Sequence, residues 1–198
     1  MLRRRLLITL ALGGLIAVPA LSARQVKSAP AKAQPKAAAA PAGPVVVLEF
    51  AKGTVEFEAL PSEAPQSVQH VLELVRRGFY RGQRLWYVTP SLIEFGDPTT
   101  RDMTKRDAWG TNGSGKTVGV DETKMAKQKF VRGVVGLGYR PEYSPKTADS
   151  YLFIIKGSNA AADGKYAVIG KVTDGITVVD KLEVTDVLKN AYVKGEKK

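Results

Sequence analysis

The sequence predicts a mainly β domain, a closed antiparallel β-barrel capped by two helices, over residues 45–198. Two observations indicate this fold. Short runs of β-branched and aromatic residues recur between glycine-rich and polar turns, and two segments carry apolar residues at helical spacing. With 198 residues, 44% of them hydrophobic and 25% charged, the composition is that of a globular protein. We therefore expect one domain whose core needs neither disulfides nor metals.

The first elements expected are a hairpin and a helix. The runs Val45–Phe50 and Thr54–Leu60 are joined by a short turn at Gly53, as in a β-hairpin. Pro65 suits the first turn of a helix, and Gly78 stands where the helix would be capped at its C-terminus. The apolar residues at helical spacing between them are Val68, Val71, Leu72 and Val75.

The remaining elements are expected on either side of a long polar segment. Residues 97–129 contain glycines and no convincing period, and a loop of this length is unusual unless it is functional or partly ordered. A second short helix is expected at Ile176–Leu182. The further strands are expected at Leu85–Val88, Leu92–Phe95, Phe130–Leu137, Ser150–Lys156, Tyr166–Val172 and Val184–Val193.

Residues 1–23 have the three parts of a secretion signal. A basic start, Arg3–Arg5, precedes the uncharged apolar run Leu6–Ala20, and small residues follow with Ala20 and Ala23 as candidate cleavage points. We expect an exported, periplasmic protein. An uncleaved N-terminal membrane anchor is the alternative, although a spanning helix needs about 20 apolar residues.

Residues 24–44 consist mostly of Ala, Pro and Lys, with almost nothing else apolar. Such a segment buries too little apolar surface to offset the entropy of ordering, and its prolines favour extended conformations. We interpret it as a disordered tether, or as a leader without a role of its own.

The charge and the residue inventory exclude several classes of function. Seven of the 30 Lys and Arg residues and none of the 19 acids lie in residues 1–44, so the +11 net charge leaves only +4 on the remainder. Nucleic-acid binding is therefore not expected. The chain has no Cys and one His, His70, which we expect to be structural. We expect no metal site and no cofactor.

Gly110-Thr111-Asn112-Gly113-Ser114-Gly115-Lys116-Thr117 matches the phosphate-loop pattern G-x-x-x-x-G-K-T. That motif binds nucleotides only between a buried strand and a helix, where its N–H groups converge on phosphate. The residues before it are polar and charged, and those after it begin a helix poorly. A glycine-rich loop without nucleotide is therefore expected.

Several motifs between Val45 and Leu182 resemble, in order and spacing, those of the cyclophilin-type peptidyl-prolyl isomerases. The similar segments are Ala64-Pro65-Gln66-Ser67-Val68, Gly78-Phe79-Tyr80-Arg81-Gly82, Gly96-Asp97-Pro98, Arg132-Gly133-Val134-Val135-Gly136-Leu137-Gly138, Ser150-Tyr151-Leu152-Phe153-Ile154, Asp163-Gly164-Lys165-Tyr166, Val168-Ile169-Gly170-Lys171-Val172 and Gly175-Ile176-Thr177-Val178-Val179-Asp180-Lys181-Leu182.

At the positions that this resemblance assigns to the active site, most residues differ from the family pattern. Tyr87 stands where the family has its essential Arg, Tyr166 replaces a His, and Phe153, the expected floor of the proline pocket, is retained. These three are the candidate catalytic residues. The candidate substrate-binding residues are Leu92, Glu94 (in place of Gln), Gly138 and Tyr139 (Ala-Asn), Tyr151 (Gln) and Ala162. We expect them around one groove, with Glu94 near its rim.

Arg84 is the basic residue nearest to Tyr87 along the chain. Because side chains alternate across a strand, Leu85 and Tyr87 should share one face while Arg84 points away. Arg84 is therefore not expected to replace the missing arginine.

The resemblance implies rotation about X–Pro bonds, which faces a barrier of about 20 kcal/mol. A charged donor aimed at the proline nitrogen lowers this barrier by stabilising only the twisted state. A tyrosine hydroxyl is an uncharged and weaker donor. We expect a monomeric isomerase of weakened activity that assists protein folding on proline-containing segments of exported proteins. A non-catalytic peptide-binding or scaffold domain is the alternative.

Overall fold

The computed structural model describes residues 43–196. The expected signal peptide, residues 1–23, and all of the expected tether except Gly43 and Pro44 lie outside the described residues. Within the described range, no helix is long and apolar enough to cross a membrane.

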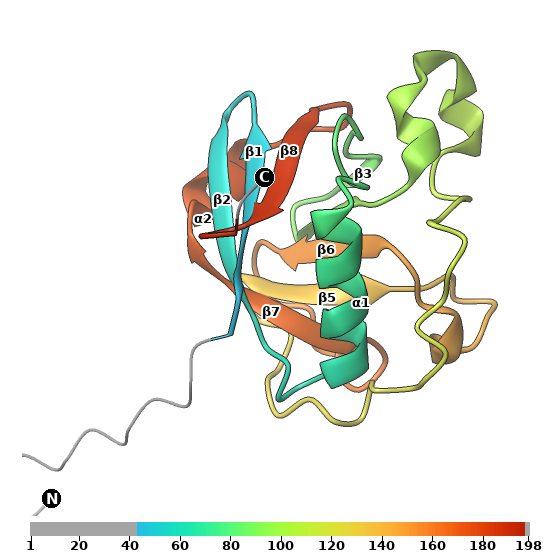
Figure 1. The fold of residues 1–198 in the computed structure, drawn as a ribbon, viewed down its shortest axis with the longest axis vertical. Coiled ribbons are helices and arrows are strands. Elements are labelled where there is room, and N and C mark those ends of the chain that lie inside the picture. The colour runs from blue at the N-terminus through green and yellow to red at the C-terminus, as the bar shows by residue number, and fades with distance from the viewer. Residues whose placement is uncertain (1–42, 197–198) are drawn as a thin grey trace, which may run out of the picture. The chain divides into compact units, whose positions relative to one another are not determined.

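Eight strands form one antiparallel sheet in the order β3-β4-β6-β5-β7-β2-β1-β8 (Figure 1). The expected mainly β fold is thus confirmed. The strands are β1 Val45–Phe50, β2 Gly53–Ala59, β3 Tyr87–Val88, β4 Leu92–Phe95, β5 Val134–Gly138, β6 Tyr151–Ile155, β7 Ala167–Asp174 and β8 Leu188–Val193.

The sheet curls, but closure into a barrel is not confirmed. Strands β3 and β8 stand at the two ends of the strand order and do not pair with each other. The segments that precede them do meet, through an isolated bridge between Arg84 and Val187 and a backbone hydrogen bond from Gly82 N–H to the Leu188 carbonyl at 2.8 Å. The architecture is therefore an open, curled sheet whose edges approach each other at one end.

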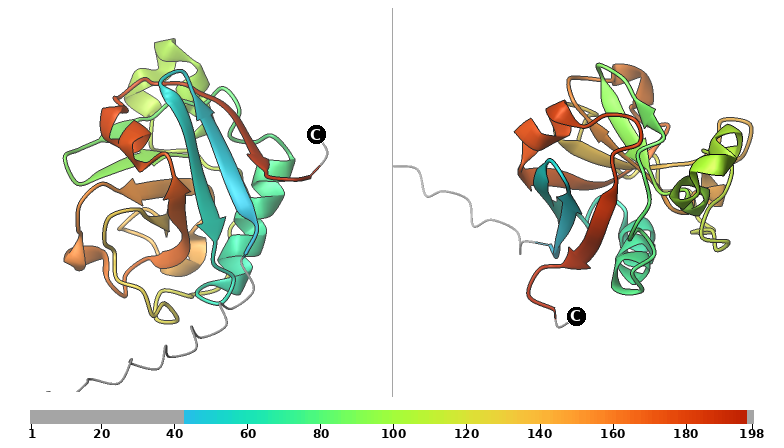
Figure 2. Two further views of the ribbon diagram at one scale, coloured as in Figure 1. Left: turned by 90° about the vertical axis from the view of Figure 1, so that its left-hand side faces the viewer. Right: turned by 90° about the horizontal axis from the view of Figure 1, so that it is seen from above.

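The two helices lie where they were expected. Helix α1, Pro65–Arg76, begins with proline in its first turn and is followed by Gly78 at φ 69°, a conformation that favours glycine after a helix. Helix α2, Ile176–Lys181, is short and follows Gly175 at φ 78°. Figure 1 shows α1 crossing in front of the sheet, and the turned views in Figure 2 show that α2 lies apart from it, beside β2.

Strand alternation divides the core into two clusters. Leu152 and Ile154 of β6 point into the main core, which includes the apolar face of α1. Phe153 and Ile155, which alternate with them, belong to a smaller cluster on the opposite face of the sheet. This second cluster also contains Phe130, Val134, Ala162 and Val168, with Leu92 and Tyr166 packed against it. Strand β6 is buried on both faces, which explains its uninterrupted apolar sequence.

Three strands are shorter than the sequence indicates. Strand β3 begins at Tyr87 rather than Leu85, because the Leu85 N–H donates to the Asp186 carbonyl. Strand β5 begins only at Val134, after Gly133 at φ 83°. Strand β8 begins at Leu188, after Thr185 at φ 80°. Backbone in the left-handed region interrupts a strand, and hydrophobic patterns alone do not reveal it.

The long segment 97–129 has structure of its own. It contains the 3₁₀ turns Pro98–Arg101 and Met103–Ala108, and the second of these protrudes from the body of the domain (Figure 2). Asp97, fully buried, accepts hydrogen bonds from the Thr99 N–H at 2.7 Å and the Thr111 N–H at 2.9 Å, so it joins the start of the segment to the residue that follows these two turns.

Candidate functional site

A pocket of about 530 Å³ opens on the outer face of the sheet, above the smaller core cluster. Its size is that of a typical small-ligand site. All nine candidate site residues line it, although they come from separate parts of the chain: Tyr87, Leu92, Glu94, Gly138, Tyr139, Tyr151, Phe153, Ala162 and Tyr166. The expectation that these residues surround one groove is thus met by the geometry.

The register of the sheet explains why these residues meet. Tyr87 of β3 pairs with Glu94 of β4, Glu94 pairs with Phe153 of β6, and Phe153 pairs with Gly136 of β5. Directly opposed residues project on the same face, so the four form one row across the sheet. The Phe153 ring lies over Gly136, where a Cβ atom would collide with it. Glycine at position 136 therefore lets the ring lie flat as the pocket floor.

Aromatic rings form most of the pocket wall. Phe153 meets Tyr166 at 5.3 Å between ring centroids in an edge-to-face arrangement, and Tyr166 meets Tyr139 at 5.1 Å. On the other side, Trp86 lies 5.8 Å from Tyr87 and 5.9 Å from Tyr151. Such contacts fix the rings in place, and each tyrosine adds a polar tip to an apolar body.

Glu94 is the pocket's unpaired carboxyl group. No hydrogen bond or ion pair to its carboxyl group exists among residues 43–196, and burial raises the pKa of Glu94 to about 8. Burial, with a contribution from the negative charge of Glu94, also raises the pKa of the hydroxyls of Tyr151 and Tyr166. Glu94 is only partly exposed, and its expected place near the rim of the groove stays a prediction.

The sequence did not indicate several other lining residues. Trp86 packs on Gly110, and Arg140 also lines the pocket. Arg140 is the single cationic side chain lining the described pocket, and it is already engaged: it pairs with Glu142 at 2.7 Å and stacks on Tyr143 at 5.3 Å. The others are Pro141, Glu142 and Asn159. Adjacency in sequence to Tyr139 was the one signal that could have drawn attention to residues 140–142.

The region around Arg84 corrects one expectation and supports another. Leu85 is fully buried in the main core whereas Tyr87 is 47% exposed, so these two residues do not share a face. Alternation fails here because β3 begins only at Tyr87. Arg84 does not line the pocket, in agreement with the expectation that it cannot replace the missing arginine.

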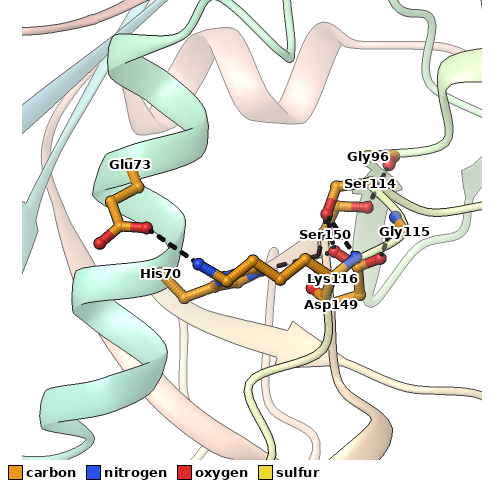
Figure 3. Close-up of polar contacts among 8 residues, drawn as sticks. All are labelled: His70, Glu73, Gly96, Ser114, Gly115, Lys116, Asp149 and Ser150. Atoms are coloured by element: carbon orange, nitrogen blue, oxygen red, sulfur yellow. Dashed lines mark hydrogen bonds and ion pairs between the residues drawn. The ribbon is translucent and has the colours of Figure 1, made fainter.

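The glycine-rich loop lacks the geometry of a phosphate site. A 3₁₀ turn precedes it, and the next element after it is strand β5 rather than a helix. Figure 3 shows that Asp149 holds the loop, because its carboxylate accepts hydrogen bonds from the Ser114 hydroxyl at 2.5 Å and the Gly115 N–H at 3.0 Å. Lys116 reaches outward to Glu73 at 3.5 Å. The N–H donor that a phosphate would need is thus bound to a carboxylate instead.

His70 has the structural role that the sequence indicated. It is 6% exposed on α1, and its Nε2 lies 3.4 Å from Asp149 Oδ1 (Figure 3). This contact links the helix to the glycine-rich loop through the same carboxylate.

The family described as "Cyclophilin type peptidyl-prolyl cis-trans isomerase/CLD" matches residues 45–196. The chain belongs to this family. It is 32% identical over 155 residues, 77% of this chain and 78% of the other, to a "Probable peptidyl-prolyl cis-trans isomerase" of Brucella abortus. The chain is therefore a cyclophilin-type peptidyl-prolyl isomerase by family.

Solved cyclophilins have the same fold. A cyclophilin type peptidyl-prolyl cis-trans isomerase of Cryptosporidium parvum superposes with a TM-score of 0.64 at 21% identity, over 78% of this chain and 99% of that one. The same protein crystallised in the presence of the dipeptide Ala-Pro gives a TM-score of 0.63 at 22% identity, over 77% and 99% of the two chains. These identities establish a common fold and do not by themselves transfer the details of the site.

Within this cyclophilin the pocket combines two unlike halves. Phe153 and Tyr166 provide an apolar surface that can hold a proline ring. Tyr87 and Glu94 occupy the positions opposite, where the resemblance predicts a cation and an amide. The pocket thus has an aromatic floor, while neither of these two positions carries a cation.

Proposed function

We propose that the protein is a peptidyl-prolyl isomerase acting on X–Pro bonds of exported polypeptides, with activity weakened because Tyr87 occupies the position of the catalytic arginine. The observation that carries this proposal is the convergence of all nine candidate residues on one pocket with Phe153 as its floor. An apolar pocket of this kind grips the proline ring and keeps water from the amide.

The chemistry available to the pocket supports a slow reaction. Twisting the X–Pro amide makes its nitrogen a better hydrogen-bond acceptor, so a donor placed beside it stabilises the transition state selectively. The pocket offers neutral hydroxyls from Tyr87, Tyr151 and Tyr166. Neutral donors are roughly half as strong as charged ones. The loss of one preorganised donor costs about 10²–10³ in rate in another class of enzyme, and we expect a deficit of that order here.

A second candidate function is peptide binding without catalysis. It is favoured by one observation, that the pocket's cation, Arg140, is paired with Glu142 rather than directed to the proline site. Four tyrosines around a groove give broad contact with extended peptides. A peptide-binding or scaffold role would need the pocket but no donor.

The cis-to-trans rate of proline tetrapeptides separates the two functions. We expect low activity in the wild type, a gain of about tenfold or more in Tyr87→Arg, and a larger gain in the Tyr87→Arg, Glu94→Gln double variant. The second change matters because Glu94, the strand neighbour of position 87, would hold the new guanidinium in an ion pair.

The matched control is Met103→Arg, which adds the same charge outside the pocket at a residue 46% exposed, compared with 47% for Tyr87. It should leave the rate unchanged. A wild-type rate equal to that of an ordinary cyclophilin, unaltered by Tyr87→Phe, would contradict the proposed role of position 87. Peptide binding without catalysis in any variant would favour the scaffold function.

Export is part of the proposal and rests on residues 1–23, whose pattern is that of a secretion signal. N-terminal sequencing of the protein from cells should give a chain starting shortly after Ala20 or Ala23, in the periplasm or an equivalent exterior space. Recovery of Met1 from a soluble cytosolic fraction would overturn it.

A further inference from the structure

The pocket is larger and more acidic than a proline ring requires. Its volume is about 530 Å³, and beside the floor made by Phe153 it contains a second group of rings, Trp86, Tyr87 and Tyr151. The Glu94 carboxyl group lies between the two groups in the sheet register, paired with Tyr87 on one side and Phe153 on the other. The proline site leaves this part of the pocket without an assigned occupant.

The ionisable groups that face Glu94 come from each of the elements around the pocket. Strand β3 contributes Tyr87, β6 contributes Tyr151, and the segments after β5 and before β7 contribute Tyr139 and Tyr166, all of which carry neutral hydroxyls. The residues after Tyr139 add the pair Arg140–Glu142 at 2.7 Å, whose charges offset each other. Across the described part of the pocket, the remaining acid without a charged partner is the Glu94 carboxyl group.

Aromatic faces and a carboxylate together form a receptor for a cation. The negative face of an aromatic ring attracts ammonium or guanidinium groups, and the attraction grows when water is excluded. A desolvated carboxyl group without a partner gains most from a positive charge brought next to it. An ionised Glu94 would repel an anionic ligand, and a neutral ligand would leave the carboxylate without a partner.

We propose that this half of the pocket binds a lysine or arginine side chain of the peptide, next to the proline, so that the protein selects basic proline-containing segments. The inference rests on the proposed function for the proline, but the cation site itself consists of Trp86, Tyr87, Glu94 and Tyr151 and needs no isomerisation.

Binding of a cation should release a proton from Glu94. The carboxyl group is protonated in the empty pocket below about pH 8, because burial raises its pKa to about 8. A neighbouring ammonium favours the ionised form and lowers that pKa. Affinity for the basic peptide should therefore rise with pH up to about 8, by at most tenfold per pH unit, and level off above it.

The test uses the full-length chain and three peptides, Ala-Xaa-Pro-Phe with Xaa lysine, norleucine or glutamate, measured by calorimetry at pH 6 and pH 8.5. Norleucine has the length of lysine without its charge. At pH 8.5 we expect the lysine peptide to bind about tenfold more tightly than the norleucine peptide, and the glutamate peptide to bind most weakly. At pH 6 the preference for lysine should shrink.

Glu94→Gln keeps the size of the side chain and removes its charge. It should abolish both the lysine preference and its pH dependence. Tyr87→Leu, at a residue 47% exposed and therefore of little consequence for folding, should reduce the preference several-fold. Glu73→Gln, which removes an acid from α1 outside the pocket, is the matched control and should change neither. Thermal unfolding of each variant verifies that it is folded.

Equal affinities for the lysine and norleucine peptides, or a lysine preference that survives in Glu94→Gln, would overturn the inference. Its failure is distinguishable from that of the proposed function. Isomerisation at equal rates for all three peptides would support the isomerase function and contradict the cation site. If N-acetyl-lysine amide competes with the lysine peptide for binding and no peptide is isomerised, the result would support the cation site and contradict the isomerase function.

Discussion

The pocket and the glycine-rich loop differ in how well a sequence motif predicts a functional site. In the pocket most residues expected of the family are replaced, yet the positions converge around a cavity of about 530 Å³. The loop 110–117 matches a phosphate-binding pattern at every specified position, yet its Gly115 N–H is donated to Asp149 and its Lys116 points to Glu73.

The difference teaches that register preserves a site more reliably than residue type does. The pairing of Tyr87, Glu94, Phe153 and Gly136 across four strands fixes the pocket whatever side chains occupy it. A phosphate loop has no such frame, because its function depends on unpaired N–H groups at the start of a helix. Four predictions, from the largest expected effect to the smallest, test this comparison.

Phe153→Ala should have the largest effect on the pocket side. The ring is 5% exposed and packs on Phe130 and Tyr166 at 5.3 Å each, so its removal should lower the free energy of unfolding by about 3 kcal/mol or more. Chemical denaturation measures this loss, and calorimetry should find no binding of proline peptides. Tyr87→Ala, at the rim, is the control and should cost less than about 1 kcal/mol. Equal losses for both variants would show that Phe153 is not the floor of the pocket.

Asp149→Ala should have the largest effect on the loop side. It removes the acceptor for Ser114 and Gly115 and the partner of His70, and we expect a loss of about 2 kcal/mol in unfolding free energy. Hydrogen exchange at residues 113–116 should accelerate. If exchange there is unchanged, the carboxylate does not hold the loop.

Glu94→Gln should stabilise the protein, and the gain should depend on pH. Between the ordinary value near 4.5 and about 8, the unfolded chain has lost the Glu94 proton while the folded chain keeps it, so wild-type stability falls as pH rises through this window. The glutamine variant escapes this loss. We expect an advantage of about 1–2 kcal/mol at pH 8, reduced because part of the side chain still contacts water, and none at pH 4.

Thermal denaturation of both proteins between pH 4 and pH 9 measures this difference. Glu73→Gln should show no such trend. An advantage for Glu94→Gln that stays constant with pH would place the cause in packing rather than in the desolvated carboxyl group.

Lys116→Ala should have the smallest effect. Its ammonium group is exposed and 3.5 Å from Glu73, and exposed pairs contribute at most about 1 kcal/mol. We expect a change below about 0.5 kcal/mol and no binding of ATP to wild type or variant in an equilibrium titration. A micromolar affinity for ATP that this substitution abolishes would reverse our interpretation of the loop.

The sequence by itself determined the order of the elements and nine of the residues that line the pocket. Alternating and β-branched runs located β1, β2, β4 and β6 to within a residue or two, and Pro65 and Gly78 bounded α1, because these patterns reflect local backbone preferences and one-sided burial. Motif spacing assigned Phe153 and the other eight residues to one groove, because aligned positions in a shared fold occupy the same places in the sheet.

The tertiary structure determined the features of the site that local sequence patterns do not encode. That Leu85 enters the core while Tyr87 faces the pocket depends on where β3 begins, which the distant residue Asp186 sets by pairing with Leu85. The pairing of Arg140 with Glu142, the hold of Asp149 on the glycine-rich loop, and the desolvation of Glu94 likewise arise from the folded chain. The protonation of Glu94 is the clearest case: a glutamate's pKa depends on the water and charges around it, which exist only once the strands have assembled.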